Sequence, residues 1–187
     1  MSVVSTGADL SELTHVPARQ GEMMKRIIRP VLLGVMFLMA ASSARAQQAV
    51  ILVRHAERAD QSKDSALSVA GRARARALAA LLADTGVNAI YASQYQRTVK
   101  TAEPLALSLK IPVQTMPAAE TKALLARLRS QHKSDVVLVV GHSDTVPELL
   151  HLLGDPAVEP IEDDDFGNVF VVVPKGDGPP VVVRMRY

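Results

Sequence analysis

From Val50 onward, short apolar runs alternate with segments of helical periodicity, and this alternation restricts the chain to very few architectures. The first run, residues 50–53, is apolar at every position, which is typical of a strand covered on both faces of a sheet. Repeated strand-then-helix units require right-handed crossovers between parallel strands. The sequence therefore predicts an α/β fold: a three-layer α/β/α sandwich with a mostly parallel sheet.

Turn and capping residues separate the predicted elements. Strands are expected at residues 50–53, 87–92, 111–116, 136–140, 169–173 and 181–185. Helices are expected at residues 69–83, 98–109 and 120–131, and from just before Pro147 to about Leu153. The connection at residues 174–180 is short and rich in Pro and Gly, so we expect the last two strands to pair antiparallel at an edge of the sheet.

Two of the predicted helices carry leucines at inward spacing. We expect these side chains to pack against the sheet: Leu78, Leu81, Leu82, Leu124, Leu125 and Leu128. Ser68 is expected to cap the first helix, because a serine hydroxyl accepts from the free backbone N–H groups of the first turn. His132 and His151 lie outside any motif and are expected to face solvent.

Polar residues follow three of the predicted parallel strands directly. The three segments are Arg54-His55-Ala56-Glu57, Ser93-Gln94-Tyr95-Gln96-Arg97-Thr98 and Gly141-His142-Ser143-Asp144. The carboxyl ends of parallel strands meet at one edge of a sheet, and ligands bind in the crevice there. Two histidines and two arginines are therefore expected to converge on one site.

These residue types suit phosphoryl transfer. A phosphoryl group in flight carries negative charge on its equatorial oxygens, so a protein needs fixed positive groups around it. Arg54 and Arg97 supply planar forks that each hold two oxygens, and a protonated His142 adds a third donor. A neutral His55 can attack phosphorus, with the main chain of the turn orienting one ring nitrogen and leaving the other free.

Each of these residues also has a structural interpretation. A histidine after a strand is often structural when taken alone, and arginines commonly form surface ion pairs. Glu57 is a plausible salt-bridge partner for Arg58 or Arg54, and the acidic run at residues 163–165 is more typical of a solvated loop than of a metal site. The combination at three strand ends favours the functional interpretation.

Four motifs in order resemble those of the histidine phosphatase superfamily, also called phosphoglycerate mutase-like. The family's Arg-His-Gly-Glu, Leu-Thr-x-x-Gly, Ser-x-x-x-Arg-x-x-x-Thr-Ala and Gly-His-Ser are similar to Arg54-His55-Ala56-Glu57, Leu67-Ser68-Val69-Ala70-Gly71, Ser93 with Arg97, Thr101 and Ala102, and Gly141-His142-Ser143. The resemblance implies that His55 is the nucleophile and that Arg54, Arg97 and His142 bind the phosphoryl group. It implies no metal and no cofactor.

The resemblance leaves the proton donor for the leaving group open. Many relatives carry a Glu beyond the third strand, and others carry an Asp directly after the late His. Glu120 and Asp144 are equally good candidates, although the surroundings of Glu120 match poorly and Asp144 comes two places after His142. Ala56 stands where the family has Gly, a change that the turn accepts if its φ is negative.

The N-terminal quarter of the chain has the pattern of an export signal. A basic stretch, an apolar run at residues 31–41 and the small residues of Ala44-Arg45-Ala46 predict a signal peptide at residues 24–46, cleaved before Gln47. Residues 1–23 are expected to be unstructured or a mis-assigned start. The apolar run is shorter than the roughly 20 residues that span a bilayer, so no stable membrane anchor is expected after cleavage. A domain at residues 47–187 in the periplasm, or secreted, is the resulting prediction.

Composition excludes several function classes. Of 21 Lys and Arg and 19 Asp and Glu, residues 47–187 keep 16 of each, so the basic character belongs to the signal segment and nucleic acid is not an expected partner. The sequence has no Cys, which excludes disulfides, thiolate catalysis and Cys-based zinc sites.

The predicted partner is a small phosphorylated substrate, and the predicted activity is metal-independent phosphomonoester hydrolysis through a phosphohistidine on His55. The absence of large insertions predicts an open pocket. Two alternatives remain at this point: a phosphohistidine protein phosphatase, and a non-catalytic phosphate-binding module of the same fold.

Overall fold

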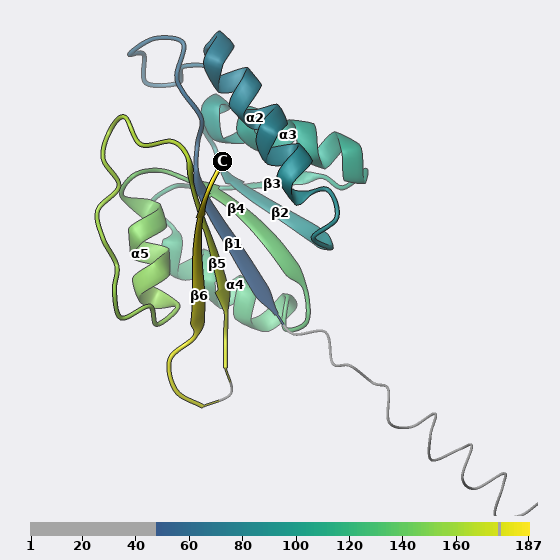
Figure 1. Cartoon of the computed structure of the whole chain (residues 1–187), viewed down its shortest axis with the longest axis vertical. Helices are drawn as coiled ribbons and strands as arrows, with labels where there is room; N and C mark the ends of the chain where they lie inside the picture. The colour runs from purple at the N-terminus through teal and green to yellow at the C-terminus, as the bar shows by residue number, and fades with distance from the viewer. Residues whose placement is uncertain (1–47, 176) are drawn as a thin grey trace, which may run out of the picture. The chain divides into compact units, whose positions relative to one another are not determined.

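The computed structural model describes residues 48–175 and 177–187 (Figure 1). The predictions for residues 1–46, a mis-assigned start followed by a signal peptide, concern residues outside this part of the chain. The boundary of the domain at residue 47 likewise stays a prediction. Among the described residues, no helix is long and apolar enough to cross a membrane.

Strands and helices alternate along the described chain as the sequence pattern predicts. The elements are β1 (Ala49–Arg54), α2 (Val69–Leu82), β2 (Val87–Ser93), α3 (Gln96–Leu109), β3 (Val113–Met116), α4 (Thr121–Gln131), β4 (Val136–Gly141), α5 (Thr145–Leu152), β5 (Asn168–Val173) and β6 (Val181–Arg186). Ser68 caps α2 as expected, since its hydroxyl accepts from the backbone N–H of Gly71 at 3.0 Å.

The strands form one sheet in the order β3-β2-β4-β1-β5-β6 (Figure 1). The pairs β1–β4, β2–β4 and β2–β3 are parallel, whereas β5 runs antiparallel to β1 and β6 runs antiparallel to β5. The predicted α/β fold, with a mostly parallel sheet and an antiparallel edge, is confirmed. Its central strands β1 and β4 carry the two histidine motifs at their carboxyl ends.

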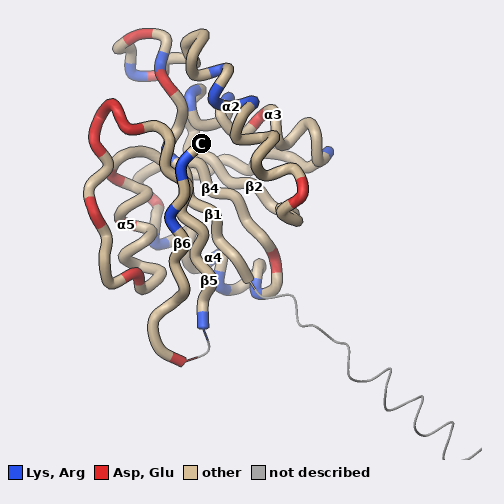
Figure 2. Tube along the Cα trace, in the orientation of Figure 1, with Lys and Arg blue, Asp and Glu red and all other residues tan. Residues whose placement is uncertain are grey.

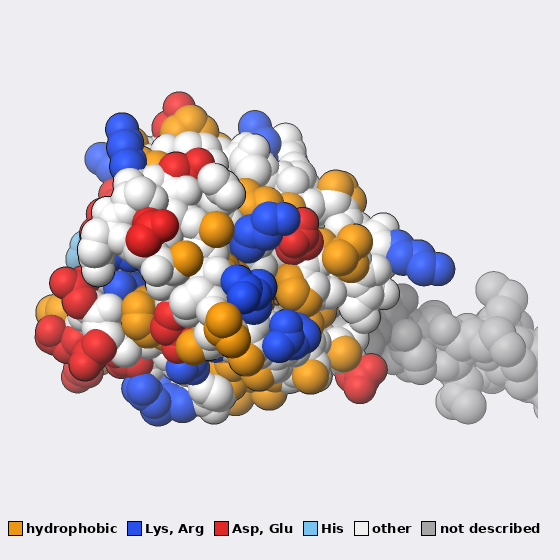
Figure 3. Space-filling model, turned by 90° about the horizontal axis from the view of Figure 1, so that it is seen from above, with side chains coloured by type: hydrophobic (Ala, Val, Ile, Leu, Met, Phe, Trp, Pro, Cys, Tyr) orange, Lys and Arg blue, Asp and Glu red, His pale blue; other side chains and the backbone are white. Residues whose placement is uncertain are grey.

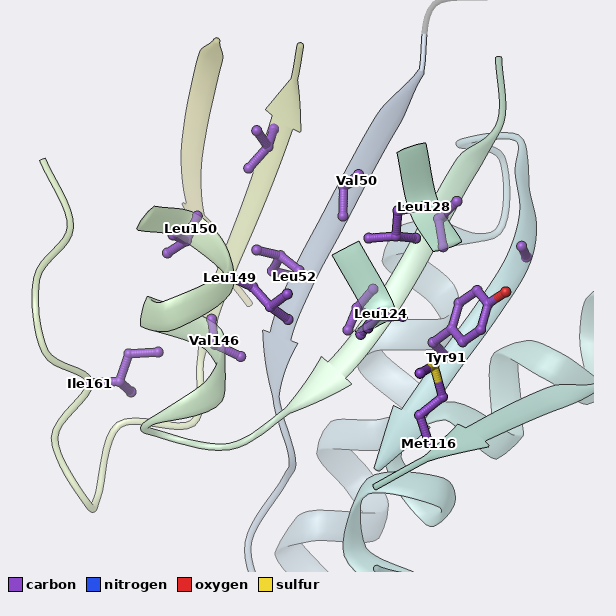
Figure 4. Packing of buried hydrophobic residues seen from close by; sticks show 14 residues of the cluster. Val50, Leu52, Tyr91, Met116, Leu124, Leu128, Val146, Leu149, Leu150 and Ile161 are labelled. Carbon is purple, nitrogen blue, oxygen red and sulfur yellow. The ribbon is translucent and has the colours of Figure 1, made fainter. Parts of the chain in front are cut away.

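Helices cover both faces of the sheet. Val50 and Leu52 of β1 face α4 and α5, where they pack with Leu124, Leu128 and Leu149 (Figure 4). The alternate residues of β1 point to the other face, where α2 and α3 pack. Full burial on both faces explains why β1 and β4 are apolar at nearly every position.

Two predictions of side-chain orientation are wrong. Leu81 is 42% exposed, because the inward stripe of α2 runs through Gly71, Ala75, Leu78 and Leu82, and Leu81 lies one position off that stripe. His132 is buried rather than facing solvent. Its ring bonds the Tyr91 hydroxyl of β2 at 2.9 Å, a contact that the tertiary fold creates, and the carboxylate of nearby Asp135 at 2.7 Å.

Candidate active site

The carboxyl ends of β1, β2 and β4 surround a pocket of about 390 Å³. Its lining residues are Arg54, His55, Arg58, Tyr95, Arg97, Ala118, His142, Ser143, Asp144 and Asp163. Arg54 pairs with Gly141 across the β1–β4 ladder, so His55 and His142 follow neighbouring strand ends. Their ring centroids lie 5.3 Å apart. The structure therefore brings together the four residues predicted to capture a phosphoryl group.

The His55 ring is held by its own turn. Its Nδ1 lies 2.8 Å from the carbonyl oxygen of Ala56, and because a carbonyl only accepts, Nδ1 carries the proton. Nε2 has no hydrogen-bond partner among the described residues, and His55 lines the pocket. The orientation of one nitrogen by the main chain, with the other left free, is as expected for a nucleophile.

The turn that holds His55 is itself tied to two helices. The backbone N–H of Ala56 donates to the Thr101 hydroxyl of α3 at 2.9 Å. The backbone N–H of Ser68, the cap of α2, donates to the carbonyl oxygen of Glu57 at 2.9 Å. The second and third sequence motifs therefore act as supports for the first.

His142 is fixed by contacts on three sides. Its backbone N–H donates to the Thr145 hydroxyl at 2.8 Å, and its Nε2 lies 2.8 Å from the Ser93 hydroxyl. Arg97 Nη2 lies 3.4 Å from His142 Nδ1 and is only a donor, so Nδ1 acts as the acceptor and Nε2 carries the proton in this neutral ring. His142 therefore becomes a donor to an anion only when Nδ1 also gains a proton.

Arg54 is 4% exposed and lies against the segment at residues 162–166, part of the acidic stretch drawn in red in Figure 2. Its Nη1 donates to the carbonyl oxygens of Glu162 at 2.5 Å and Asp165 at 3.3 Å, and its guanidinium stacks on Phe166 at 4.3 Å. The Asp163 carboxylate, 3.8 Å from Nη2, points into solvent. The prediction of a merely solvated acidic loop is therefore incomplete, because its main chain binds Arg54.

Arg97 has no carboxylate in ion-pair contact among the described residues. Its Nη1 donates to the Lys63 carbonyl oxygen at 2.9 Å, and its guanidinium lies 4.4 Å from the Tyr95 ring centroid. The Nε atoms of Arg54 and Arg97 are buried without a hydrogen-bond partner within the same residues. Two cations with weak or no carboxylate pairing make the pocket receptive to an anion.

Both histidines are neutral at neutral pH. Burial, followed by the nearby positive groups, lowers the pKa of His55 from 6.5 to about 3. Burial and the charge of Arg97 lower the pKa of His142 to about 4, against a smaller opposing effect of Asp144. A neutral His55 keeps its lone pair for attack, whereas His142 needs a bound anion to favour its protonated form.

These depressed pKa values predict acid sensitivity of the fold. Between pH 6.5 and the folded-state pKa values of about 3 and 4, the unfolded chain binds protons that the folded chain does not. The free energy of unfolding is therefore expected to fall as the pH falls below about 6.5, by up to about 1.4 kcal/mol per pH unit for each histidine. Urea unfolding of the His142→Gln variant should show a shallower pH dependence. The matched variant His151→Gln, at an exposed position, should leave it unchanged, and equal slopes in both would contradict the prediction.

The two candidate proton donors occupy different places. Asp144 lines the pocket, and its Oδ1 accepts from the backbone N–H of Thr145 at 2.7 Å, which caps α5. Glu120 is exposed at the start of α4 and lines a separate small cavity with Met116 and Leu124. The structure therefore brings Asp144, and not Glu120, to the pocket of His55.

Sequence reasoning missed three residues of the site. Arg58 and Tyr95 line the pocket, and Phe166 stacks on Arg54. Arg58 and Tyr95 adjoin recognised motifs, a signal that was present, whereas nothing in the sequence marks Phe166. Glu57 pairs with Arg74 of α2 at 2.7 Å, rather than with either arginine suggested for it.

Comparison with known families agrees with the geometry of the site. Residues 50–121 match the model of the histidine phosphatase superfamily (branch 1). The resemblance to the histidine phosphatase superfamily is confirmed. The matched segment contains the first three motifs, and the structure adds the fourth by placing His142 beside His55. A search of curated proteins gives no match to the chain.

Solved structures share the histidine phosphatase fold at low sequence identity. The protein histidine phosphatase SixA, complexed with tungstate, is 21% identical, with a TM-score of 0.61 over 74% of this chain and 96% of that one. Phosphoserine phosphatase from Entamoeba histolytica, in complex with 3-phosphoglyceric acid, is 18% identical, with a TM-score of 0.58 over 75% and 97%. A mycobacterial glucosyl-3-phosphoglycerate phosphatase with inorganic phosphate is 15% identical, with a TM-score of 0.58 over 74% and 96%. These likenesses establish the fold.

Proposed function

We propose that the chain is a phosphatase that hydrolyses phosphomonoesters through a phosphohistidine intermediate on His55. The observation that carries the proposal is the state of the His55 ring. It is neutral, its Nδ1–H is held by Ala56, and its free Nε2 shares a pocket with Arg54 and Arg97. A neutral nucleophile beside two weakly paired guanidinium groups suits attack on a dianionic phosphoryl group.

In the first step, Nε2 of His55 attacks phosphorus, and the bond between phosphorus and the leaving oxygen breaks. Arg54 and Arg97 compensate the charge on the equatorial oxygens. The bound dianion raises the pKa of His142, whose protonated Nδ1 then donates to the phosphoryl group as well. Asp144 is the proposed source of the proton for the leaving alcohol.

In the second step, water attacks the phosphohistidine and the P–N bond breaks. Asp144, now ionised, accepts a proton from the attacking water, so that inorganic phosphate leaves and His55 returns to its neutral form. No step needs a metal ion. Within residues 48–175 and 177–187, no three His, Cys, Asp or Glu side chains gather as a metal site would require.

Independence from metal is directly measurable. Hydrolysis of an aryl phosphate by the purified chain is expected to proceed in metal-free buffer, and EDTA is expected to leave kcat and KM unchanged, because protein cations perform the charge compensation. A panel of sugar, lipid and amino acid phosphates then defines the preferred leaving group. Loss of activity in EDTA that added Mg²⁺ or Zn²⁺ restores would contradict the scheme.

The proton donor is testable with two matched variants. Asp144→Asn is expected to lower kcat for alkyl phosphates by about 10²-fold or more, the usual contribution of a positioned general acid. The loss should be smaller for aryl phosphates, whose leaving groups need less protonation. Glu120→Gln should match the unmodified chain, since Glu120 lies outside the pocket. A loss of kcat in Glu120→Gln, with none in Asp144→Asn, would assign the role of proton donor to Glu120.

A phosphohistidine protein phosphatase is the second candidate. Its support is the shared fold with SixA, together with the chemistry of the leaving group, because an imidazole departs with little help from an acid. Faster turnover of a phosphohistidine peptide than of any phosphoester would favour it. Absence of turnover, with phosphate still raising Tm, would indicate the non-catalytic phosphate-binding module instead.

Export is proposed on the sequence pattern of residues 24–46 alone. A periplasmic or secreted enzyme would meet phosphomonoesters rather than cytoplasmic phosphorelay proteins, which favours the first candidate. N-terminal sequencing of the protein recovered from the periplasm should begin at Gln47. An intact N-terminus in the cytoplasmic fraction would contradict export.

A further inference from the structure

The outer edge of the sheet carries an apolar stripe. β6 is an edge strand, and within the described residues only β5 pairs with it (Figure 1). Val181, Val183 and Met185 of β6 are 42%, 45% and 37% exposed. They lie opposite valines of β5 and share the face of the sheet on which α2 and α3 pack. The helices do not cover this outer strand of the face, so the three side chains stay partly exposed. An edge strand of this kind is a template for another strand.

The hydrogen-bonding phase of β6 is fixed at its carboxyl end. The backbone N–H of Tyr187 donates to the carbonyl oxygen of Gly167 at 3.1 Å, and the two residues continue the β5–β6 register. Hydrogen-bonded and non-bonded pairs alternate along an antiparallel ladder. The odd-numbered residues of β6 therefore direct their N–H and C=O groups toward β5. Val182 and Arg184 direct theirs outward, away from the sheet.

We propose that β6 pairs antiparallel with β6 of a second copy of this chain, with Val183 on the two-fold axis. Val183 then lies opposite Val183 of the other copy, and Val181 lies opposite Met185, which joins the two apolar stripes. In the same register Val182 lies opposite Arg184. The outward N–H and C=O groups of Val182 and Arg184, which β5 leaves free, then bond each other across the interface. The same register therefore forms the backbone hydrogen bonds and brings the apolar side chains together.

Neighbouring registers fit less well. A shift by two residues in one direction places Arg184 opposite Arg184, and like charges directly opposite are destabilising. The shift in the other direction places Arg184 opposite Pro180, which has no N–H for the ladder, so the pairing shortens to residues 181–183. A shift by one residue places outward-directed N–H and C=O groups of one copy opposite residues that direct theirs toward β5. It also places the apolar side chains of the two copies on opposite faces of the sheet.

Charge does not block the proposed pairing. Arginines on an edge strand usually discourage association. Here Arg184 pairs with Asp155 at 2.5 Å and Arg186 pairs with Asp165 at 2.8 Å, so each copy neutralises its own edge cations. A single strand pair buries less than the roughly 1,200–2,000 Å² of a stable interface, so we expect a weak, concentration-dependent dimer.

The dimer leaves both candidate active sites open. β6 runs parallel to β1, so its carboxyl end lies at the same edge of the sheet as His55. In an antiparallel pair the two pockets therefore open at opposite ends of one continuous sheet. The inference is independent of the catalytic proposal and does not alter the chemistry of either pocket.

Single cysteines test the register, because the sequence contains none of its own. Val183→Cys in the full chain is expected to form a disulfide-linked dimer under mild oxidation, since non-hydrogen-bonded pairs place Cα atoms about 4.5 Å apart, within disulfide range. Val181→Cys alone should form no disulfide-linked dimer, because residue 181 meets Met185, whereas the Val181→Cys, Met185→Cys double variant should cross-link.

Leu107→Cys, at a more exposed apolar position on α3, measures non-specific association. Sedimentation of the unmodified chain should show a monomer–dimer equilibrium that Val183→Lys shifts to monomer. Equal cross-linking at residues 183, 181 and 107, or an unmodified chain that stays monomeric as concentration rises, would overturn the proposed interface.

Discussion

Replacing His55 with alanine is expected to lower kcat for aryl phosphate hydrolysis by about 10⁴-fold or more, the usual cost of removing a covalent nucleophile. The expectation follows from the place of the ring. His55 Nε2 is free in the pocket, whereas both nitrogens of His142, the other imidazole that lines the pocket, have hydrogen-bond partners. The measurement is steady-state kinetics beside the unmodified chain.

Phosphate binding shows whether His55→Ala loses turnover because the nucleophile is missing or because the pocket is disrupted. His55→Ala keeps Arg54 and Arg97, so inorganic phosphate should still raise Tm in that variant. The matched variant His151→Ala, at an exposed histidine of α5, should keep full activity. Turnover in His55→Ala within tenfold of the unmodified rate would exclude His55 as the nucleophile.

Gly71→Ala is expected to give the second large effect, although residue 71 contacts no substrate in the proposed scheme. A Cβ at Gly71 would lie 2.3 Å from the carbonyl oxygen and 3.1 Å from the nitrogen of Glu57. Both are backbone atoms, so relief requires α2 and the His55 turn to separate. We expect a loss of about 1–3 kcal/mol in the free energy of unfolding from overpacking. We also expect a fall in kcat of tenfold or more, because displacement of Glu57 moves Ala56, which orients the His55 ring.

Ala73→Ser is the control for Gly71→Ala, because Ala73 is exposed on the same helix. It should change the free energy of unfolding by less than about 0.5 kcal/mol and leave kcat unchanged. Urea unfolding and steady-state kinetics measure both quantities. Unchanged kcat in Gly71→Ala would show that the packing of α2 on the turn does not position His55.

Much of the fold could be predicted because the pattern of the sequence is local and strong. The continuous apolar runs of β1 and β4 have one reasonable interpretation, a buried parallel strand. The prediction for Leu81 was wrong because Leu78, Leu81 and Leu82 fit more than one inward-facing stripe of the helix. Only the packing of α2 against the sheet decides which stripe is buried. The prediction for His132 was wrong because its buried partner Tyr91 comes from β2, far away in the sequence, and nothing close to His132 in the sequence marks that contact.

The candidate site was predictable to the extent that strand ends converge. Arg54, His55, Arg97 and His142 follow three strands of one parallel sheet, so the topology alone brings them together. The wall formed by residues 162–166 was not predictable, because it binds Arg54 through main-chain carbonyl groups and Phe166, which leave no chemical signature in the sequence. The choice between Glu120 and Asp144 likewise depended on the loops that precede α4 and α5.

The most direct test of the central claim is to trap the phosphorylated protein. The chain is mixed with a radiolabelled phosphomonoester and quenched in alkali, which preserves phosphohistidine, and peptides are then mapped by mass spectrometry. The proposal predicts one phosphoryl group per chain, on His55, and none in His55→Ala. Turnover without a phosphoryl-protein, or a phosphoryl group on any other residue, would contradict it.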